Sequence, residues 1–186
     1  MKQIKIWSIL LLALMMMPLL ISCGRSEKDF DEELGQGYIL FAKTMYGNAL
    51  VYDEIKGAWH KAIFDKESPS GKYCKNFDDA IDEILDSLDA YNVREDTKSY
   101  NDSLLEVASH LNPPPSSRKD CYDDFVSIVS DVSFLNRMVL NPSGSLKEYR
   151  EKGGLLFDTI AVKMDKFRIK YGNILPKKAE SDGIDD

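Results

Sequence analysis

The sequence has few of the residues that build metal centres from imidazole or thiolate ligands. Its 186 residues include 2 His and 3 Cys, without the close spacing of a zinc site. Basic residues are also in the minority, with 24 Lys and Arg against 31 Asp and Glu. Because nucleic-acid binding normally requires a basic face, we expect neither a metal ion nor a nucleic-acid partner.

The short motifs that indicate a catalytic centre are missing too. The chain has no glycine-rich phosphate loop, no nucleophile elbow and no Cys-x-x-Cys pair. Nine acids lie between residues 77 and 102, but they match neither a calcium loop nor a di-iron pattern, and a solvated helix face explains them. His60 and His110 have no evident partner for acid–base chemistry. We therefore expect a protein that is not an enzyme and that has no cofactor.

The first 22 residues have the pattern of a secretory signal. Lys2 and Lys5 precede an almost wholly apolar run from Ile6 to Ile21, and the chain becomes polar directly after Cys23. A transmembrane helix would need about 20 apolar residues. This run is shorter and is broken by Pro18. The pattern favours a cleaved signal over a membrane span.

The end of this run, Leu20-Ile21-Ser22-Cys23, resembles the lipobox of bacterial lipoproteins. The resemblance implies that Cys23 is acylated, with palmitate among the expected chains, and becomes the first residue of the mature protein. Two or three acyl chains anchor a protein stably, since each buried methylene contributes about 0.8 kcal/mol. The expected location is the bacterial cell envelope, attached to the outer membrane and facing the periplasm or the cell surface.

Residues 24–33 contain five acids and two bases. A solvated tether leading into a helix is one interpretation. The other is a surface-export signal, because acids soon after the lipidated Cys resemble those of Bacteroidota lipoproteins. We expect a signal peptide over 1–22, a tether over 23–29, a helical domain over 30–175 and a disordered polar tail over 176–186.

Apolar residues in the expected domain recur every three or four positions, which predicts amphipathic helices. The first helix covers about 29–65, with an apolar line through Leu34, Tyr38, Phe41, Met45, Ala49 and Tyr52. The second begins with Asn76 as its N-cap and reaches about residue 111, either running straight through or breaking near Asn92.

Two further helices follow the proline-rich segment after residue 112. Ser117 with Asp120 predicts the start of the third helix, and Ser145 with Glu148 predicts a capping box for the fourth. No segment shows convincing strand alternation. Four helical stretches joined by short Pro- and Gly-containing turns predict an all-α, antiparallel, up-and-down bundle of about four helices.

Cys74 and Cys121 remain as a possible disulfide pair in an oxidising compartment. A continuous second helix would be roughly 50 Å long at 1.5 Å per residue and would hold the two cysteines apart. Only a break near Asn92 would bring them together, and we favour free thiols.

Three phrases in the mature chain also resemble a loose set of uncharacterised exported bacterial helical proteins: Trp59-x-x-Ala62-Ile63, Leu111-Asn112-Pro113-Pro114 and Asn141-Pro142-Ser143-Gly144-Ser145-Leu146. This resemblance implies a helical bundle and no particular activity. The leading functional hypothesis is a non-enzymatic binding module, anchored to the membrane through lipid on Cys23, with an unidentified protein partner at the envelope. The alternative is a carrier that holds a small apolar ligand between helices, motivated by glycines within the helices. An unrecognised enzyme is the third hypothesis.

Overall fold

The computed structural model describes residues 25–74 and 76–176. The expected signal peptide, Cys23 and residues 177–186 lie outside the described residues. Five α-helices follow one another in the order α2 (Glu27–His60), α3 (Phe77–Ala90), α4 (Val93–His110), α5 (Lys119–Leu140) and α6 (Leu146–Tyr171). Short π- and 3₁₀-helical segments, Lys61–Asp65 and Ser116–Arg118, extend α2 and precede α5.

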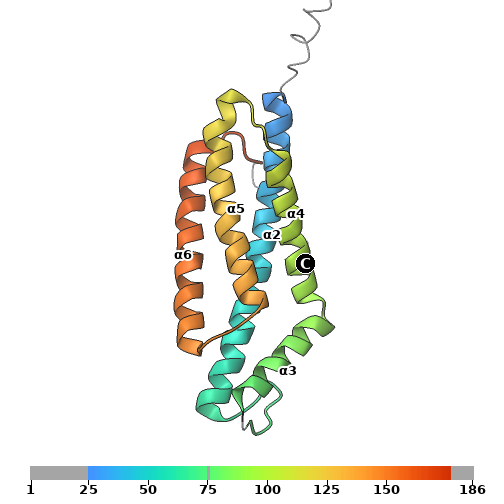
Figure 1. Cartoon of the computed structure of the whole chain (residues 1–186), viewed down its shortest axis with the longest axis vertical. Coiled ribbons are helices and arrows are strands. Elements are labelled where there is room, and N and C mark those ends of the chain that lie inside the picture. The colour runs from blue at the N-terminus through green and yellow to red at the C-terminus, as the bar shows by residue number, and fades with distance from the viewer. Residues whose placement is uncertain (1–24, 75, 177–186) are drawn as a thin grey trace, which may run out of the picture.

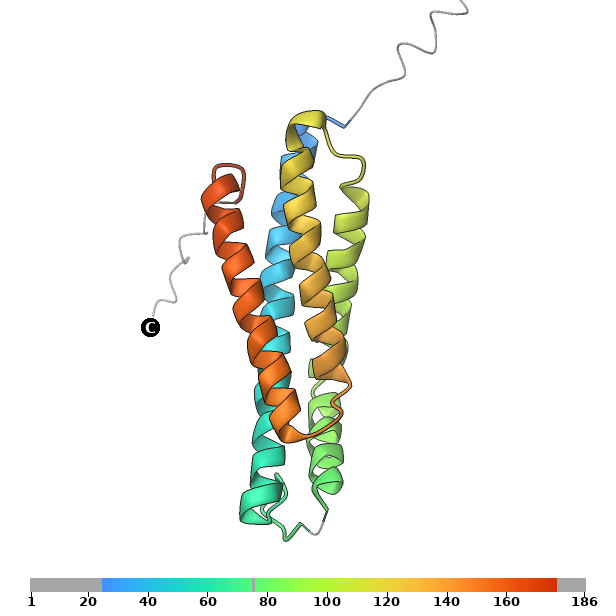
Figure 2. The ribbon, with the colours of Figure 1, turned by 60° about the vertical axis from the view of Figure 1, so that its left-hand side comes forward.

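The helices form an up-and-down bundle, as the sequence predicts (Figure 1). α2 runs the whole length in one direction, α3 and α4 together return, and α5 and α6 complete the bundle. The turned view in Figure 2 shows α6 and α4 on opposite sides of the bundle, with α2 and α5 between them. Phe30, Leu34, Ile55, Leu104 and Phe125 are among the fully buried side chains of a single main core.

Local signals explain where most helices begin. Ser26 accepts a hydrogen bond from the backbone N–H of Asp29 at 3.1 Å and caps α2. Asn76 caps α3 in the same way, as predicted. Ser145 and Glu148 form the predicted capping box of α6 with bonds of 3.1 and 3.2 Å.

Two expected boundaries require correction. α2 begins at Glu27, so the last three residues of the expected tether belong to the helix. The expected Ser117–Asp120 cap does not form, because a 3₁₀ turn runs directly into α5 and its N-cap residue, Arg118, makes no side-chain cap bond. The Ser117 hydroxyl donates instead to Glu27 on α2 at 2.6 Å.

The second expected helix breaks, which answers the question that the sequence left open. Asn92 has φ 58° and ψ 14° in the left-handed region, and it separates α3 from α4. Asn tolerates this conformation better than other residues with a Cβ. Phe77 and Tyr91 continue the helical spacing of Ile81, Ile84 and Leu88, but they lie at the two ends of α3 and are 46% and 78% exposed.

The break does not bring the two cysteines together. Both thiols are free and buried. Cys74 packs with Ala62 and Ala80 beside the start of α3, whereas Cys121 belongs to the main core in the first turn of α5. These two helix starts lie at opposite ends of the bundle (Figure 1).

Candidate ligand-binding groove between α4 and α5

A layer of polar side chains crosses the middle of the bundle. Thr44 and Asn48 on α2, Thr97 and Asn101 on α4, and Asn136 on α5 are all buried. The Asn136 amide nitrogen donates to the Asn48 carbonyl oxygen at 2.8 Å, linking α5 to α2. The Thr97 hydroxyl donates a hydrogen bond to the backbone carbonyl of Val93, one turn earlier in α4, at 2.6 Å. A buried polar layer needs such partners, because an unpaired buried amide costs about 1–3 kcal/mol.

Gly47 lets this layer form. A Cβ at residue 47 would lie 3.0 Å from the Thr97 Cβ and closer still to the rest of that side chain. The missing side chain therefore allows α4 to approach α2 closely where both helices bury polar groups. Gly37 likewise leaves room for the side chains of Val107 and Phe125. Gly153 leaves room for those of Tyr52 and Met138. These mid-helix glycines contact neighbouring side chains and line no space between the helices.

A groove of about 550 Å³ opens onto this layer between α4 and α5. Three cations line it, Arg94, Lys98 and Arg137, together with three carboxylates, Asp89, Glu95 and Asp102. The remaining lining residues are neutral: Asn101, Ser133, Asn136, Asn141, Leu105 and Leu140. Hereafter we call this feature the α4–α5 groove.

The charges of the α4–α5 groove are largely paired. Arg94 donates to Asp89 at 2.8 Å and to the Leu140 carbonyl at 3.0 Å. Lys98 donates to Asp102 at 2.8 Å, and this hydrogen bond raises the pKa of the exposed lysine. Among the described residues, Arg137 and Glu95 form no ion pair. The groove thus contains one charge of each sign that forms no direct ion pair with another described residue.

The floor of the groove contains amide groups with spare hydrogen-bonding capacity. Asn101 and Asn136 are only 5% and 3% exposed. Ser133 donates to the Asn101 carbonyl at 3.0 Å, and the Asn136 nitrogen is engaged by Asn48. The Asn101 nitrogen and the Asn136 carbonyl bond to no other described residue, and the buried Nε of Arg94 also has no partner there.

This arrangement is suited to binding and orienting a polar molecule. Amides and paired ions recognise hydrogen-bonding groups, whereas proton transfer needs a base with a suitable pKa next to its substrate. Over residues 25–74 and 76–176, no three His, Cys, Asp or Glu side chains gather closely enough to hold a metal ion. His60 contacts Phe64 at the end of α2, and His110 lies near Glu33 at the other end of the bundle.

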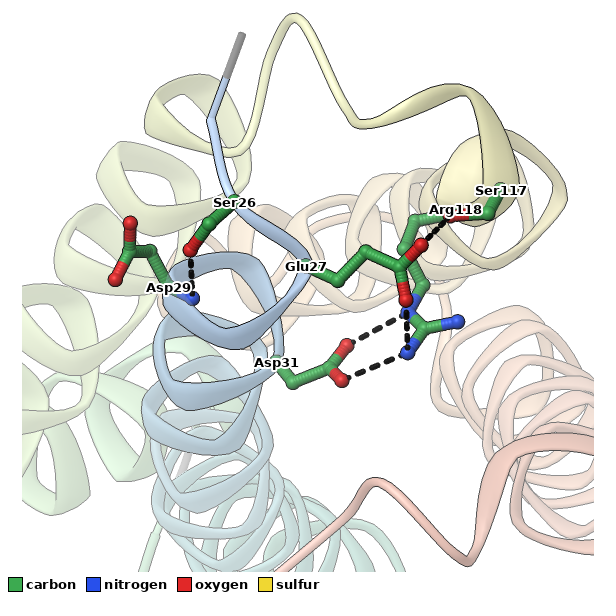
Figure 3. A network of polar contacts seen from close by, with 6 residues as sticks. All are labelled: Ser26, Glu27, Asp29, Asp31, Ser117 and Arg118. Carbon is green, nitrogen blue, oxygen red and sulfur yellow. Dashed lines mark hydrogen bonds and ion pairs between the residues drawn. The ribbon is translucent and has the colours of Figure 1, made fainter. Parts of the chain in front are cut away.

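A second polar cluster holds the start of α2 against the loop before α5, and we call it the N-terminal clamp (Figure 3). Arg118 donates to both carboxylate oxygens of Asp31, at 2.8 and 2.9 Å, and lies 3.2 Å from Glu27. The bidentate bond to Asp31 raises the pKa of the guanidinium. Beside it, Arg25 donates to Glu33 and to the His110 carbonyl. The described chain is therefore fixed to the bundle from its first residue.

Cys23, the expected lipid site, lies two positions before Arg25 and outside the described residues. Within the described part of the chain, none of the helices is both long and apolar enough to cross a membrane. Comparison with protein-family models, with curated proteins and with solved structures finds no match for this chain.

Sequence reasoning missed the groove residues, although one signal was present. Asn136 falls between Val132 and Val139 on the apolar line of α5, and Asn101 falls three residues before Leu104 on that of α4. An Asn at a core position of a helix indicates a buried polar contact. The pairing of these positions across two helices could not be predicted without the register of the bundle.

Proposed function

We propose that this protein is a lipid-anchored, non-enzymatic binding protein of a bacterial cell envelope. The observation that carries the proposal is the sequence Leu20-Ile21-Ser22-Cys23 at the end of a basic and then apolar leader. Acyl chains on Cys23 would hold the bundle at a membrane surface. The α4–α5 groove, with its amide floor and balanced charges, supports binding rather than catalysis.

Contacts beside the N-terminal clamp support a short connection between the proposed anchor at Cys23 and the bundle. Arg25 is already bound to Glu33 and to the carbonyl of His110. Two Cα–Cα steps of about 3.8 Å separate it from Cys23, so the Cα of the acylated residue would be no more than about 8 Å from that of Arg25. We infer that the end of the bundle with the N-terminal clamp faces the membrane and that the α2–α3 turn lies farthest from it.

The glycines do not favour the alternative of an apolar carrier. Gly37, Gly47 and Gly153 face side chains from neighbouring helices, and these fill the space that a ligand would need. The largest core side chains, including Tyr149, Phe30 and Phe125, are fully buried in one packed cluster. We therefore do not propose an apolar ligand between the helices.

Metabolic labelling with an alkyne fatty acid tests the anchor. The wild-type protein should take up the label and lose its first 22 residues, while Cys23→Ser should remain unlabelled and retain them. Cys74→Ala is the matched control, because it removes a thiol from the bundle and should leave labelling and cleavage unchanged. Equal labelling of wild type and Cys23→Ser would contradict the proposal.

A further inference from the structure

We propose that the α4–α5 groove binds a short zwitterionic peptide. This inference deepens the proposed binding function by naming the ligand class. It depends on three features of the groove, namely the two asparagines of its floor, the buried Nε of Arg94, which has no partner among the described residues, and the charges of Arg137 and Glu95, which form no ion pair there. Each feature matches a different group of the ligand.

The floor matches an amide group. The Asn101 nitrogen is a free donor and the Asn136 carbonyl is a free acceptor, and both side chains are more than nine-tenths buried. A carboxamide or a peptide unit carries one acceptor and one donor and would satisfy both. A buried polar group that gains a partner on binding contributes to affinity, because leaving it unpaired is unfavourable.

The rim matches the two ends of a zwitterion. Among the described residues, neither Arg137 nor Glu95 forms an ion pair, and both side chains are exposed. Arg137 lies over the ring of Phe134. Lys98 lies about one turn after Glu95 in α4. Guanidinium groups bind carboxylates through paired N–H donors, and the nearby Nε of Arg94 is a further donor without a partner. Glu95 would accept the ammonium group of the ligand.

The same features disfavour other small ligands. A polyanion such as a nucleotide would face three carboxylates, two of which already neutralise the groove's Arg94 and Lys98. None of the described residues that line the groove is aromatic, so a nucleobase would have no ring to stack on. A net-neutral ligand with charged ends disturbs the existing ion pairs least.

Isothermal titration of the full-length protein in nonionic detergent with glycylglutamine tests the inference. This dipeptide has two charged ends and a side-chain carboxamide. We expect saturable 1:1 binding with a Kd below about 1 mM, equivalent to at least about 4 kcal/mol. Absence of saturation at about 10 mM would overturn the inference, as would saturable binding of N-acetylglucosamine without binding of the dipeptide.

Variants at the rim keep the test independent of folding, because both charged side chains are exposed. Arg137→Gln and Glu95→Gln should each weaken binding by about tenfold, whereas Lys147→Gln on the exposed face of α6 should not change it. Asn101→Asp, which replaces the free donor with an acceptor, should weaken binding similarly. Unchanged affinity in both rim variants would refute the assignment.

A double-mutant cycle identifies the carboxylate contact. The methyl ester of glycylglutamine should bind the wild type about tenfold more weakly than the free dipeptide, and Arg137→Gln should remove this difference. Equal binding of ester and free dipeptide to the wild type would overturn the proposed contact. Failure of this titration leaves the fatty-acid labelling of Cys23 unaffected, and absence of labelling leaves the titration unaffected, so the two proposals can fail separately.

Discussion

At the scale of single residues, small and amide side chains decide the orientation of α2. Hydrophobic spacing predicts that Tyr38, Phe41 and Met45 follow Leu34 towards the core. These three side chains are half-buried and pack against the edge of the core. The fully buried line runs instead from Leu34 through Gly37, Thr44 and Asn48 to Val51. Periodicity identifies the helix, but it cannot recognise a face made of glycine and polar residues, because their burial depends on partners from other helices.

Two adjacent glycines in α6 provide a test of close packing. A Cβ at Gly153 would lie 2.9 Å from the Tyr52 Cζ and 3.1 Å from the Met138 Cε, whereas a Cβ at Gly154 meets nothing within 4 Å. Gly153→Ala should therefore destabilise the protein by about 1–3 kcal/mol in chemical denaturation. Gly154→Ala should instead be neutral or stabilise it by up to about 1 kcal/mol. Equal effects would contradict the close approach of α2 and α6.

Burial also controls the chemistry of Cys121. The side chain is 1% exposed, and burial raises the pKa of its thiol to about 12. Since the thiolate is the reactive form, Cys121 should resist iodoacetamide at pH 8 in the native protein and react after denaturation. Peptide mapping measures both states. Rapid native labelling of Cys121, or a Cys74–Cys121 disulfide peptide, would contradict the packing of α5.

At the scale of elements, capping residues predict helix starts only where the preceding chain is free to bend into the cap. Asn76 and Ser145 follow turns and form their caps. Ser117 has the same local pattern, but it lies within a 3₁₀ turn and bonds to Glu27 on another helix. The tertiary contact thus overrides the local signal, and sequence spacing alone contains no information about it.

Paired serine variants test this distinction. Ser145→Ala should lower the free energy of unfolding by about 1 kcal/mol, while Ser117→Ala should change it by no more than about 0.5 kcal/mol. Hydrogen bonds from the backbone and side chain of Ser145 lower the pKa of Glu148 below 4.5. The stabilising contribution of the ionised Glu148 carboxylate is therefore present at neutral pH and is lost as the pH falls below about 4.5.

Urea denaturation of the same variants at pH 7 and pH 3 measures both the difference between the two serine variants and the pH dependence of the capping box. The cost of Ser145→Ala should be smaller at pH 3 than at pH 7, because Glu148 takes up protons as the pH falls and its carboxylate then contributes less to the capping box. A larger cost for Ser117→Ala than for Ser145→Ala would show that the start of α5 depends on the cap that the structure lacks.

The break between α3 and α4 is a second feature that the sequence pattern predicts only in part. The apolar stripe weakens between residues 92 and 103, which correctly locates an interruption without deciding between a bend and a straight exposed stretch. Asn92 in the left-handed conformation provides the bend. Asn is enriched in that conformation but also occurs within helices, so its presence alone does not determine the backbone.

At the scale of the whole molecule, the all-α bundle was predictable because its signals are local. Helical periodicity and short turns specify antiparallel neighbours. The N-terminal clamp and the α4–α5 groove were not predictable, since each joins residues far apart in the chain. Arg118 pairs with Asp31 across 87 positions, and Asn136 pairs with Asn48 across 88.

The proposed orientation predicts a difference in depth between the two ends of the bundle. Ser116 lies beside the N-terminal clamp, while Lys72 lies in the turn beyond α2, whose 34 residues span about 50 Å. A fluorophore on Ser116→Cys should be quenched by spin-labelled lipid headgroups in reconstituted vesicles, and one on Lys72→Cys should not. Stronger quenching at residue 72 would contradict a membrane-facing clamp.

The central claim is that Cys23 anchors the bundle through acyl chains, and the intact N-terminal peptide of the mature protein tests it most directly. Mass spectrometry of protein purified from bacterial membranes should find a chain beginning at Cys23 with a diacylglyceryl group on sulfur. An unmodified Cys23 thiol, or a mature chain that begins at another residue, would contradict the claim.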